Sequence, residues 1–453
     1  MTRQVQRVRM SQWVDPAAVY AALAEGQSRT VWLDAGPHAT TGLSYISIPT
    51  EKTLHENVDE GDVTIFERLR SAVEHDSTVD TSVVREDGFA LGWVGWLGYE
   101  LAAHTTGVPT AHARTPDALF VYVDWTLEFD HESHTLDLLV LGDKDALQSR
   151  LTAVEEVLKS APTPVVDVAV TAQQAAVTWR HNPQRYQALV QECLDAITAG
   201  DAYQLCLTNE VRVTGAFNPL EVYLRLREAN PSHHGGLIVV EDIALLSSSP
   251  EVFLSVDSDG HLTTKPIKGT RRRGESVALD AALAEELLAS EKERAENLMI
   301  VDLMRNDVGR VAQLGTVQVD SLLEVETYEH VHQLVSTVSA DLAHGLTAVD
   351  ALEACFPAGS MTGAPKISAM TILHGLEQGP RGIYSGAFGY LGIDGAANLA
   401  MVIRSIVLTP EGASIGTGGG ITSGSEPQAE LEETWIKVAP LLRALGVSPS
   451  EYS

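Results

Sequence analysis

The chain has 453 residues, of which 44% are hydrophobic and 20% charged, a composition that is ordinary for a folded globular protein. Its 61 acidic residues outnumber its 31 basic residues and give a formal charge of −30 at pH 7. This charge argues against nucleic acid and anionic membranes as partners, because both require a basic face. No apolar run approaches the ~18 residues of a membrane span, and the N-terminus lacks the apolar stretch of a signal peptide, so a cytoplasmic location is expected.

The first third of the chain is typical of short strands separated by turns. β-branched and aromatic residues predict strands at 31–33, 89–99, 119–123 and 136–141. A short helix is expected after Leu151, followed by the best candidate for a boundary, Ala161-Pro162-Thr163-Pro164. We therefore expect an N-terminal region over residues 1–165 and a second region over residues 175–448, which together share one intertwined fold.

The remainder of the chain is richer in helix. Helical periodicity predicts three long helices, the last with a kink at Pro440. These helices are expected at Pro183–Ala199, Ala281–Met304 and Ala429–Leu445, with apolar strands between the last two at 383–390 and 400–404.

Two of these helices carry glutamate pairs with the same spacing. Glu293 and Glu296 lie three residues apart, as do Glu430 and Glu433. Residues at i and i+3 share one helix face, so two facing pairs would form an all-oxygen site that suits Mg²⁺. Glutamate pairs on solvated helix faces are the commoner explanation, and the spacing does not show that the two helices meet.

Residues 249–268 predict a β-hairpin with a turn at Asp257-Ser258-Asp259-Gly260. Glu251 and Lys268 would then lie close together at its open end. A desolvated lysine can lose its proton well below its usual pKa, so the two could act as acid and nucleophile. A surface salt bridge across the hairpin is the commoner explanation of such a pair.

Glycine is concentrated at Gly416–Gly420, without the pattern of a nucleotide-binding loop. These glycines could allow backbone N–H groups to approach an anion, or they could form a tight turn between strands. The glycines and prolines of Pro357–Lys366 predict an irregular loop.

Six motifs, in this order along the chain, resemble the chorismate-utilising enzymes. That family includes the large subunits of anthranilate and aminodeoxychorismate synthases, and the isochorismate and salicylate synthases. The resemblance implies an α+β fold like that of anthranilate synthase component I, with two large antiparallel sheets packed face to face and helices outside. The motifs are Pro266–Arg271, Glu293–Asn297, Val301–Asp307, Phe356–Lys366, Gly418–Ile421 and Glu430–Thr434.

The resemblance also assigns roles to individual residues. It implies that all four glutamates of the two pairs belong to a Mg²⁺ site, some of them acting through water. Arg404 and Tyr384 match residues that hold the enolpyruvyl carboxylate of chorismate, a task that suits the arginine fork. Other substrate contacts are expected from Gly269, Thr270, Ser360, Gly418, Gly420 and Lys437.

Two positions favour the branch of the family that makes 4-amino-4-deoxychorismate for p-aminobenzoate and folate synthesis. Lysine at position 268 marks that branch, whereas relatives that make anthranilate usually carry alanine there. The resemblance implies that Lys268 attacks C2 of the chorismate ring, that Glu251 protonates the departing C4 hydroxyl, and that ammonia then enters at C4. Gln204 stands where isochorismate-forming relatives have a lysine base, which disfavours hydroxylation. Gln333 replaces a frequent histidine and puts elimination of pyruvate in doubt.

The ammonia must come from another active site. None of the cysteines lies in a Gly-x-Cys-x-Gly elbow, so a separate glutamine amidotransferase subunit is the implied partner. An anthranilate synthase component I is the nearest alternative function. An isochorismate or salicylate synthase and a non-catalytic chorismate-binding protein are more distant alternatives.

Overall fold

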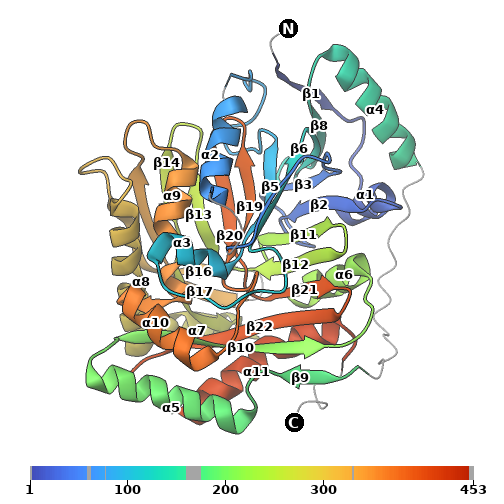
Figure 1. Ribbon diagram of the computed structural model, residues 1–453. Helices are drawn as coiled ribbons and strands as arrows, with labels where there is room; N and C mark the ends of the chain where they lie inside the picture. Colours follow the sequence, from blue (N-terminus) through green and yellow to red (C-terminus); the bar gives the residue numbers. More distant parts are fainter. Residues whose placement is uncertain (1–2, 59–62, 77, 160–174, 329–330, 448–453) are drawn as a thin grey trace.

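The computed structural model describes residues 3–58, 63–76, 78–159, 175–328 and 331–447 (Figure 1). Within these residues, twelve strands form one sheet and ten strands form another, and neighbouring strands run antiparallel. The predicted α+β architecture is therefore confirmed. The predicted boundary at Ala161–Pro164 lies outside the described residues.

The larger sheet, called sheet 1 below, takes strands from both halves of the chain. Its order of hydrogen-bonded neighbours is β1 (Val5–Arg9), β8 (Thr135–Leu141), β7 (Trp125–Asp130), β3 (Leu43–Ser47), β2 (Arg29–Asp34), β11 (His234–Val240), β12 (Ile243–Ser249), β21 (Ser405–Thr409), β22 (Gly412–Ile421), β10 (Gln204–Val213) and β18 (Gly363–Ala364), with β9 (Val177–Trp179) paired to β10. The two halves meet where β2 pairs with β11.

Sheet 2 is mixed in the same way. Its order is β15 (Ile267–Arg272), β17 (Val331–Asp341), β14 (His261–Thr264), β13 (Val252–Val256), β20 (Ala397–Met401), β19 (Ala387–Gly392), β5 (Gly92–Leu97), β6 (Ala118–Val123) and β4 (Thr53–Glu56), with β16 (Gln318–Thr327) paired to β17. Here the halves meet where β5 pairs with β19.

Helices cover the outer faces of both sheets (Figure 1). Those on sheet 1 are α1 (Pro16–Ala24), α4 (Lys144–Lys159), α5 (Pro183–Ala199), α6 (Pro219–Ala229), α10 (Lys366–Glu377) and α11 (Pro427–Ala444). Those on the side of sheet 2 are α2 (Ile65–Asp76), α7 (Val277–Ala289), α8 (Glu291–Gly309) and α9 (Ala348–Cys355), while α3 (Ala102–Thr106), η1 (Tyr99–Leu101) and η2 (Gly359–Met361) lie in connections. In the described ranges every helix is too short or too polar to cross a bilayer.

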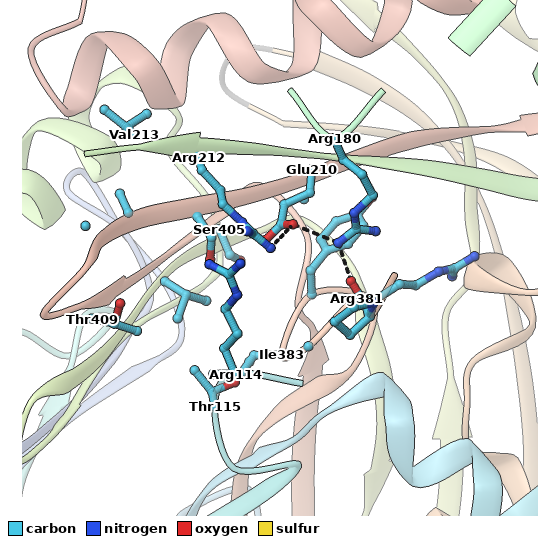
Figure 2. Close-up of a pocket in the computed structure, with 18 of the residues that line it drawn as sticks. Arg114, Thr115, Arg180, Glu210, Arg212, Val213, Arg381, Ile383, Ser405 and Thr409 are labelled. Carbon is cyan, nitrogen blue, oxygen red and sulfur yellow. Dashed lines mark hydrogen bonds and ion pairs between the residues drawn. The ribbon is translucent and has the colours of Figure 1, made fainter. Parts of the chain in front are cut away.

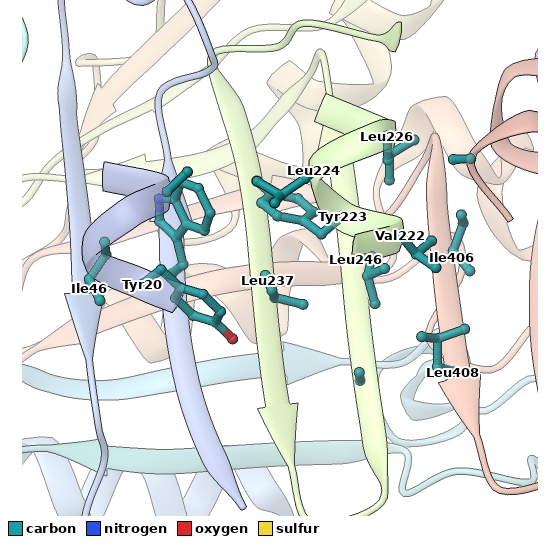
Figure 3. Packing of buried hydrophobic residues seen from close by; sticks show 14 of the residues in the cluster. Tyr20, Ile46, Val222, Tyr223, Leu224, Leu226, Leu237, Leu246, Ile406 and Leu408 are labelled. Atoms are coloured by element: carbon teal, nitrogen blue, oxygen red, sulfur yellow. The ribbon is translucent and has the colours of Figure 1, made fainter. Parts of the chain in front are cut away.

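Alternate residues of the central strands enter different cores. Ile238 and Leu245 of sheet 1 join Val94 of sheet 2 in a core between the sheets. Their neighbours Leu237 and Leu246 point the other way, into a core beneath helix α6 (Figure 3). Because successive side chains alternate between faces, strands that are buried on both faces contain continuous apolar runs.

Two predicted helices are confirmed closely. Helix α5 spans Pro183–Ala199, with Asn182 as its N-cap and Gly200 in the left-handed region after its last residue. Helix α11 spans Pro427–Ala444 and contains Pro440.

The single helix predicted for Ala281–Met304 is wrong, because the chain breaks at Ser290 into α7 and α8. The Ser290 hydroxyl accepts a hydrogen bond from the Glu293 backbone N–H and caps the second helix. Ser-x-x-Glu is the sequence pattern of a helix start, so this break could have been predicted from residues 290–293.

Three strand predictions need correction near the candidate site residues. The hairpin is confirmed over β13 and β14, but Lys268 lies beyond it on β15, which pairs with β17. Gly416–Gly420 lie inside β22, so the tight-turn alternative is wrong. Tyr384 and Arg404, expected in strands, lie in connections because β19 begins at Ala387 and β20 ends at Met401.

Candidate active site

The amine of Lys268 reaches from sheet 2 to the inner face of sheet 1. A Cβ at Gly420 of β22 would lie 3.5 Å from Lys268 Nζ and 2.5 Å from Gln204 Nε2. A side chain at position 420 would therefore displace the Gln204 amide, whereas its Cβ would only contact Lys268 Nζ. Lys268 itself is half-buried.

Gln204 presents an unsatisfied amide beside Lys268. It is 0% exposed, and neither its Oε1 nor its Nε2 atom has a hydrogen-bond partner within the described residues. A buried amide without partners costs free energy, so a bound polar ligand would stabilise this position.

Glu251 lies next to Lys268 but is more deeply buried, with 8% of its surface exposed. Burial raises the pKa of Glu251 from its ordinary 4.5 to about 7, opposed by the charge of Lys268 and by hydrogen bonds from the Ser360 hydroxyl and the Ile267 N–H. Both protonation states of Glu251 are therefore accessible near neutral pH, as a group that donates and accepts protons requires.

The four glutamates of helices α8 and α11 come within electrostatic range of each other. Burial raises the pKa of Glu296, and the charges of Glu293 and Glu430 raise it further. Burial also raises the pKa of Glu430, as does the charge of Glu433. The two helix faces thus converge on one acidic region, as two facing pairs require.

Backbone glycines make room for these carboxylates. A Cβ at Gly419 would lie 2.9 Å from Glu430 Oε2, and a Cβ at Gly269 would lie 3.1 Å from Glu293 Oε2. Gly269 also has φ 90° in a bulge of β15, a conformation that favours glycine. Thr270, the next residue, is exposed and pairs with Gln333.

Basic side chains surround the acidic region. Lys437 Nζ lies 2.7 Å from Glu433 Oε1 and donates a hydrogen bond of 2.6 Å to the carbonyl of Gly418. Lys292 Nζ lies 4.0 Å from Glu296 Oε1, and Arg271 Nη1 lies 3.5 Å from Glu293 Oε1. Lys292 and Arg271 were not predicted as site residues, although Lys292 directly precedes the first glutamate of the pair.

The chemistry of the acidic region fits a hard divalent cation. Its donors are carboxylate oxygens, and Glu296 Oε1 is buried without a hydrogen-bond partner in the described ranges. No three Asp, Glu, His or Cys side chains of those ranges lie close enough together to hold a metal ion by themselves. A cation held here would therefore complete its coordination with water or with a bound ligand.

Tyr384 and Arg404 occupy neighbouring connections between strands. The ring of Tyr384 lies against Gly416, where a Cβ would be 2.0 Å from the ring. Arg404 has φ 51°. Burial lowers the pKa of Arg404, opposed by Tyr384 and Glu433, so the guanidinium lies inside the protein and near both groups.

A buried ion pair, not predicted from the sequence, joins the elements around the site. Arg381 donates to both carboxylate oxygens of Glu377, at 2.8 Å each. It also donates to the carbonyls of Met361, next to Ser360, and Cys206 on β10, at 2.6 and 2.9 Å. Arg381 thereby ties helix α10 to β10 and to the loop of Ser360.

Glu100 holds the segment that leads to Tyr384. Its carboxylate accepts hydrogen bonds from the backbone N–H groups of Arg381 and Gly382, at 2.8 and 2.9 Å. Burial raises the pKa of Glu100 to about 8, opposed by these N–H donors. Glu100 and Arg381 are 281 residues apart, and no local pattern reveals their contact.

The fold agrees with the comparisons to known proteins. A family model described as chorismate binding enzyme matches residues 28–443. The chain belongs to this family of chorismate binding enzymes.

Two relatives from Streptomyces carry the name aminodeoxychorismate synthase. The protein from Streptomyces pristinaespiralis is 44% identical over 391 residues, which are 84% of this chain and 54% of the relative. The protein from Streptomyces griseus is 40% identical over an aligned length of 457, and the alignment covers 96% of this chain and 63% of the relative. The chain thus spans less than two thirds of either relative.

Other relatives carry different names. Anthranilate synthase component 1 of Thermus thermophilus is 40% identical over 365 residues, covering 80% of this chain and 78% of that protein. The crystal structure of anthranilate synthase component I from Streptococcus pneumoniae has a TM-score of 0.75 at 30% identity and covers 89% of this chain and 93% of that one. The predicted fold is confirmed by this likeness.

The contributions of Glu377 and Arg381 to the free energy of unfolding should depend strongly on each other. Arg381→Met leaves the Glu377 carboxylate buried and unpaired, so we expect the free energy of unfolding to fall by about 3–5 kcal/mol. The loss in Arg381→Met/Glu377→Leu should be smaller than the sum of the two single losses by about 0.5–3 kcal/mol. Urea unfolding of the four proteins measures this difference, and strictly additive losses would contradict the pairing.

Ionisation of Glu251 should destabilise the fold as the pH rises. The unfolded carboxyl ionises near pH 4.5, whereas the folded one keeps its proton until about pH 7. The cost therefore grows between these two values, and Glu251→Gln should be more stable than the wild type by about 3 kcal/mol above pH 7 and equally stable near pH 4. Urea unfolding across this range tests the prediction, with the exposed Glu285→Gln as control. A stability difference that does not change with pH would refute it.

Proposed function

We propose that the chain aminates chorismate at C4 and releases water and 4-amino-4-deoxychorismate, for p-aminobenzoate and folate synthesis. The observation that carries the proposal is a half-buried lysine beside a buried carboxyl whose pKa is raised to about 7, the pair Lys268 and Glu251. The two Streptomyces relatives named aminodeoxychorismate synthase support the same reaction.

In the first step the neutral amine of Lys268 bonds to C2 of the ring. Both conjugated double bonds of the ring shift, and the C4 hydroxyl leaves as water after it takes the proton of Glu251. Burial favours the protonated form of Glu251, which makes that proton available near neutral pH.

In the second step ammonia attacks C4. Both double bonds shift back, and the bond between Lys268 Nζ and C2 breaks, which restores the lysine amine. The Glu251 carboxylate takes a proton from the new ammonium group, so both side chains return to their starting states. The net change exchanges one hydroxyl for one amino group.

Binding would depend on groups around this pair. Arg404 and Tyr384 would hold the enolpyruvyl carboxylate, and the free amide of Gln204 would meet a polar group of the substrate. Mg²⁺, when bound by Glu293, Glu296, Glu430 and Glu433, would neutralise the ring carboxylate and draw electron density from the ring. The remaining contacts would come from Gly269, Thr270, Ser360, Gly418, Gly420 and Lys437.

We further propose that a glutamine amidotransferase subunit supplies the ammonia and that the reaction takes place in the cytoplasm. Free ammonium should then replace the partner in a purified system, because the steps above require only ammonia.

Anthranilate synthesis is the second candidate. The Thermus thermophilus and Streptococcus pneumoniae relatives named anthranilate synthase favour it. That reaction places the amine ortho to the carboxylate and eliminates pyruvate, so it has no use for a covalent bond from Lys268. The presence of this lysine favours the first candidate.

Mass spectrometry of the products distinguishes these functions. Purified chain with chorismate, Mg²⁺ and ammonium should form 4-amino-4-deoxychorismate, which keeps the enolpyruvyl group. Lys268→Ala should lose or redirect this product, because the covalent step is removed. Lys265→Ala, on the same segment but exposed, should behave as the wild type. Anthranilate as the wild-type product, no new amino compound, or an unaffected Lys268→Ala enzyme would each reject the proposal.

A further inference from the structure

A second cavity, of about 270 Å³, lies on sheet 1 beyond the site of Lys268 (Figure 2). It is lined by residues of β9, β10, β21 and β22, including Arg212 and Ser414, which face each other in the register of β10 and β22. In the same register Cys206 pairs with Gly420, so the Lys268 site lies six residues farther along these strands. Tyr384 also lines this cavity, and its ring lies against Gly416, between the two places.

The polar lining of this cavity has an excess of positive charge. Arg114, Arg180 and Arg212 face only two carboxylates, those of Glu210 and Glu411, while the lining residue Arg381 is already paired with Glu377. Glu210 accepts hydrogen bonds of 2.7 Å from both Arg180 and Arg212. This local excess is notable in a chain with a formal charge of −30.

Arg114 lies within electrostatic range of Glu411, whose pKa its charge helps to lower, but it is not held by a direct contact. It makes no hydrogen bond and no ion pair within 4 Å to any part of the chain that the structure describes. Figure 2 shows the side chains of Arg114 and Arg212 extending toward one another. Two like charges that converge on a cavity repel each other, and an anion between them would remove this cost.

The rest of the lining combines threonine, serine and asparagine residues with apolar ones, and the apolar part limits the kind of anion. Val213, Ile383, Val402 and Val407 contribute hydrocarbon surface, and Tyr384 contributes a ring. The volume equals that of about nine water molecules, at roughly 30 Å³ each. A carboxylate on a compact apolar body would match both the guanidinium groups and these walls.

We propose that this cavity binds a small organic carboxylate, with its charged group at Arg114 and Arg212 and its apolar body against the valines and Tyr384. The cavity shares Tyr384 with the site around Lys268, but the inference does not depend on the reaction proposed above.

Calorimetric titration of the full chain with benzoate tests this site. We expect one saturable site for benzoate and binding at least about tenfold weaker for benzamide, a neutral molecule of the same shape. Arg114→Gln and Arg212→Gln should each weaken benzoate binding about tenfold, since each removes one charge-assisted hydrogen bond. Arg185→Gln, a half-buried arginine on α5 outside this cavity, is the control and should bind as the wild type.

Arg404→Gln separates this cavity from the site around Lys268. Benzoate affinity should be unchanged in that variant. The proposal is overturned if the wild type shows no saturable binding, if benzamide binds as well as benzoate, if Arg114→Gln and Arg212→Gln both bind benzoate normally, or if affinity is lost in Arg404→Gln alone.

Discussion

The burial of carboxylates in an already acidic chain is the constraint on which this site depends. Three glutamates, Glu251, Glu296 and Glu433, lie within electrostatic range of the amine of Lys268, and a carboxylate taken out of water costs free energy unless cations or N–H donors compensate it. The raised pKa values of Glu251, Glu296 and Glu430 are the part of this cost that the surrounding groups leave uncompensated. A cation or a polar ligand that binds here removes a cost already present in the fold, which strengthens its binding.

The glycines of β22 show how much of the structure can be predicted from a short stretch of sequence. Their density indicated that something approaches the backbone closely, with an anion and a tight turn as the alternatives. The structure places a strand there and fills the space above it with the side chains of Tyr384 and Gln204. Which side chain meets which glycine is set by the register of β10 against β22 and by a connection from another sheet. Neither the register nor this connection can be predicted from the five residues Gly416–Gly420 alone.

Helix starts can be predicted from a short stretch of sequence, whereas pairs of residues far apart in the chain cannot. The break at Ser290 depends on atoms within three residues, so the Ser-x-x-Glu pattern was sufficient to predict it. The positions of the two glutamate pairs on their helices were likewise local, and they were correct. The contacts of Arg381 with Cys206 and Glu100 span 175 and 281 residues, so they follow from the topology of the sheets alone.

Along strands β10 and β22 of sheet 1, the local charge near Gly420 is opposite to the local charge near Ser414. Carboxylates gather at the Gly420 end, whereas guanidinium groups outnumber carboxylates beside Ser414. The net charge of the whole chain repels any anionic ligand at long range, so each end needs local positive charge to retain one. At the Ser414 end the fold supplies that charge with its own arginines. At the Gly420 end Lys268 and Lys437 lie among glutamates that offset their charge, and the Mg²⁺ proposed above would add positive charge for an anionic substrate.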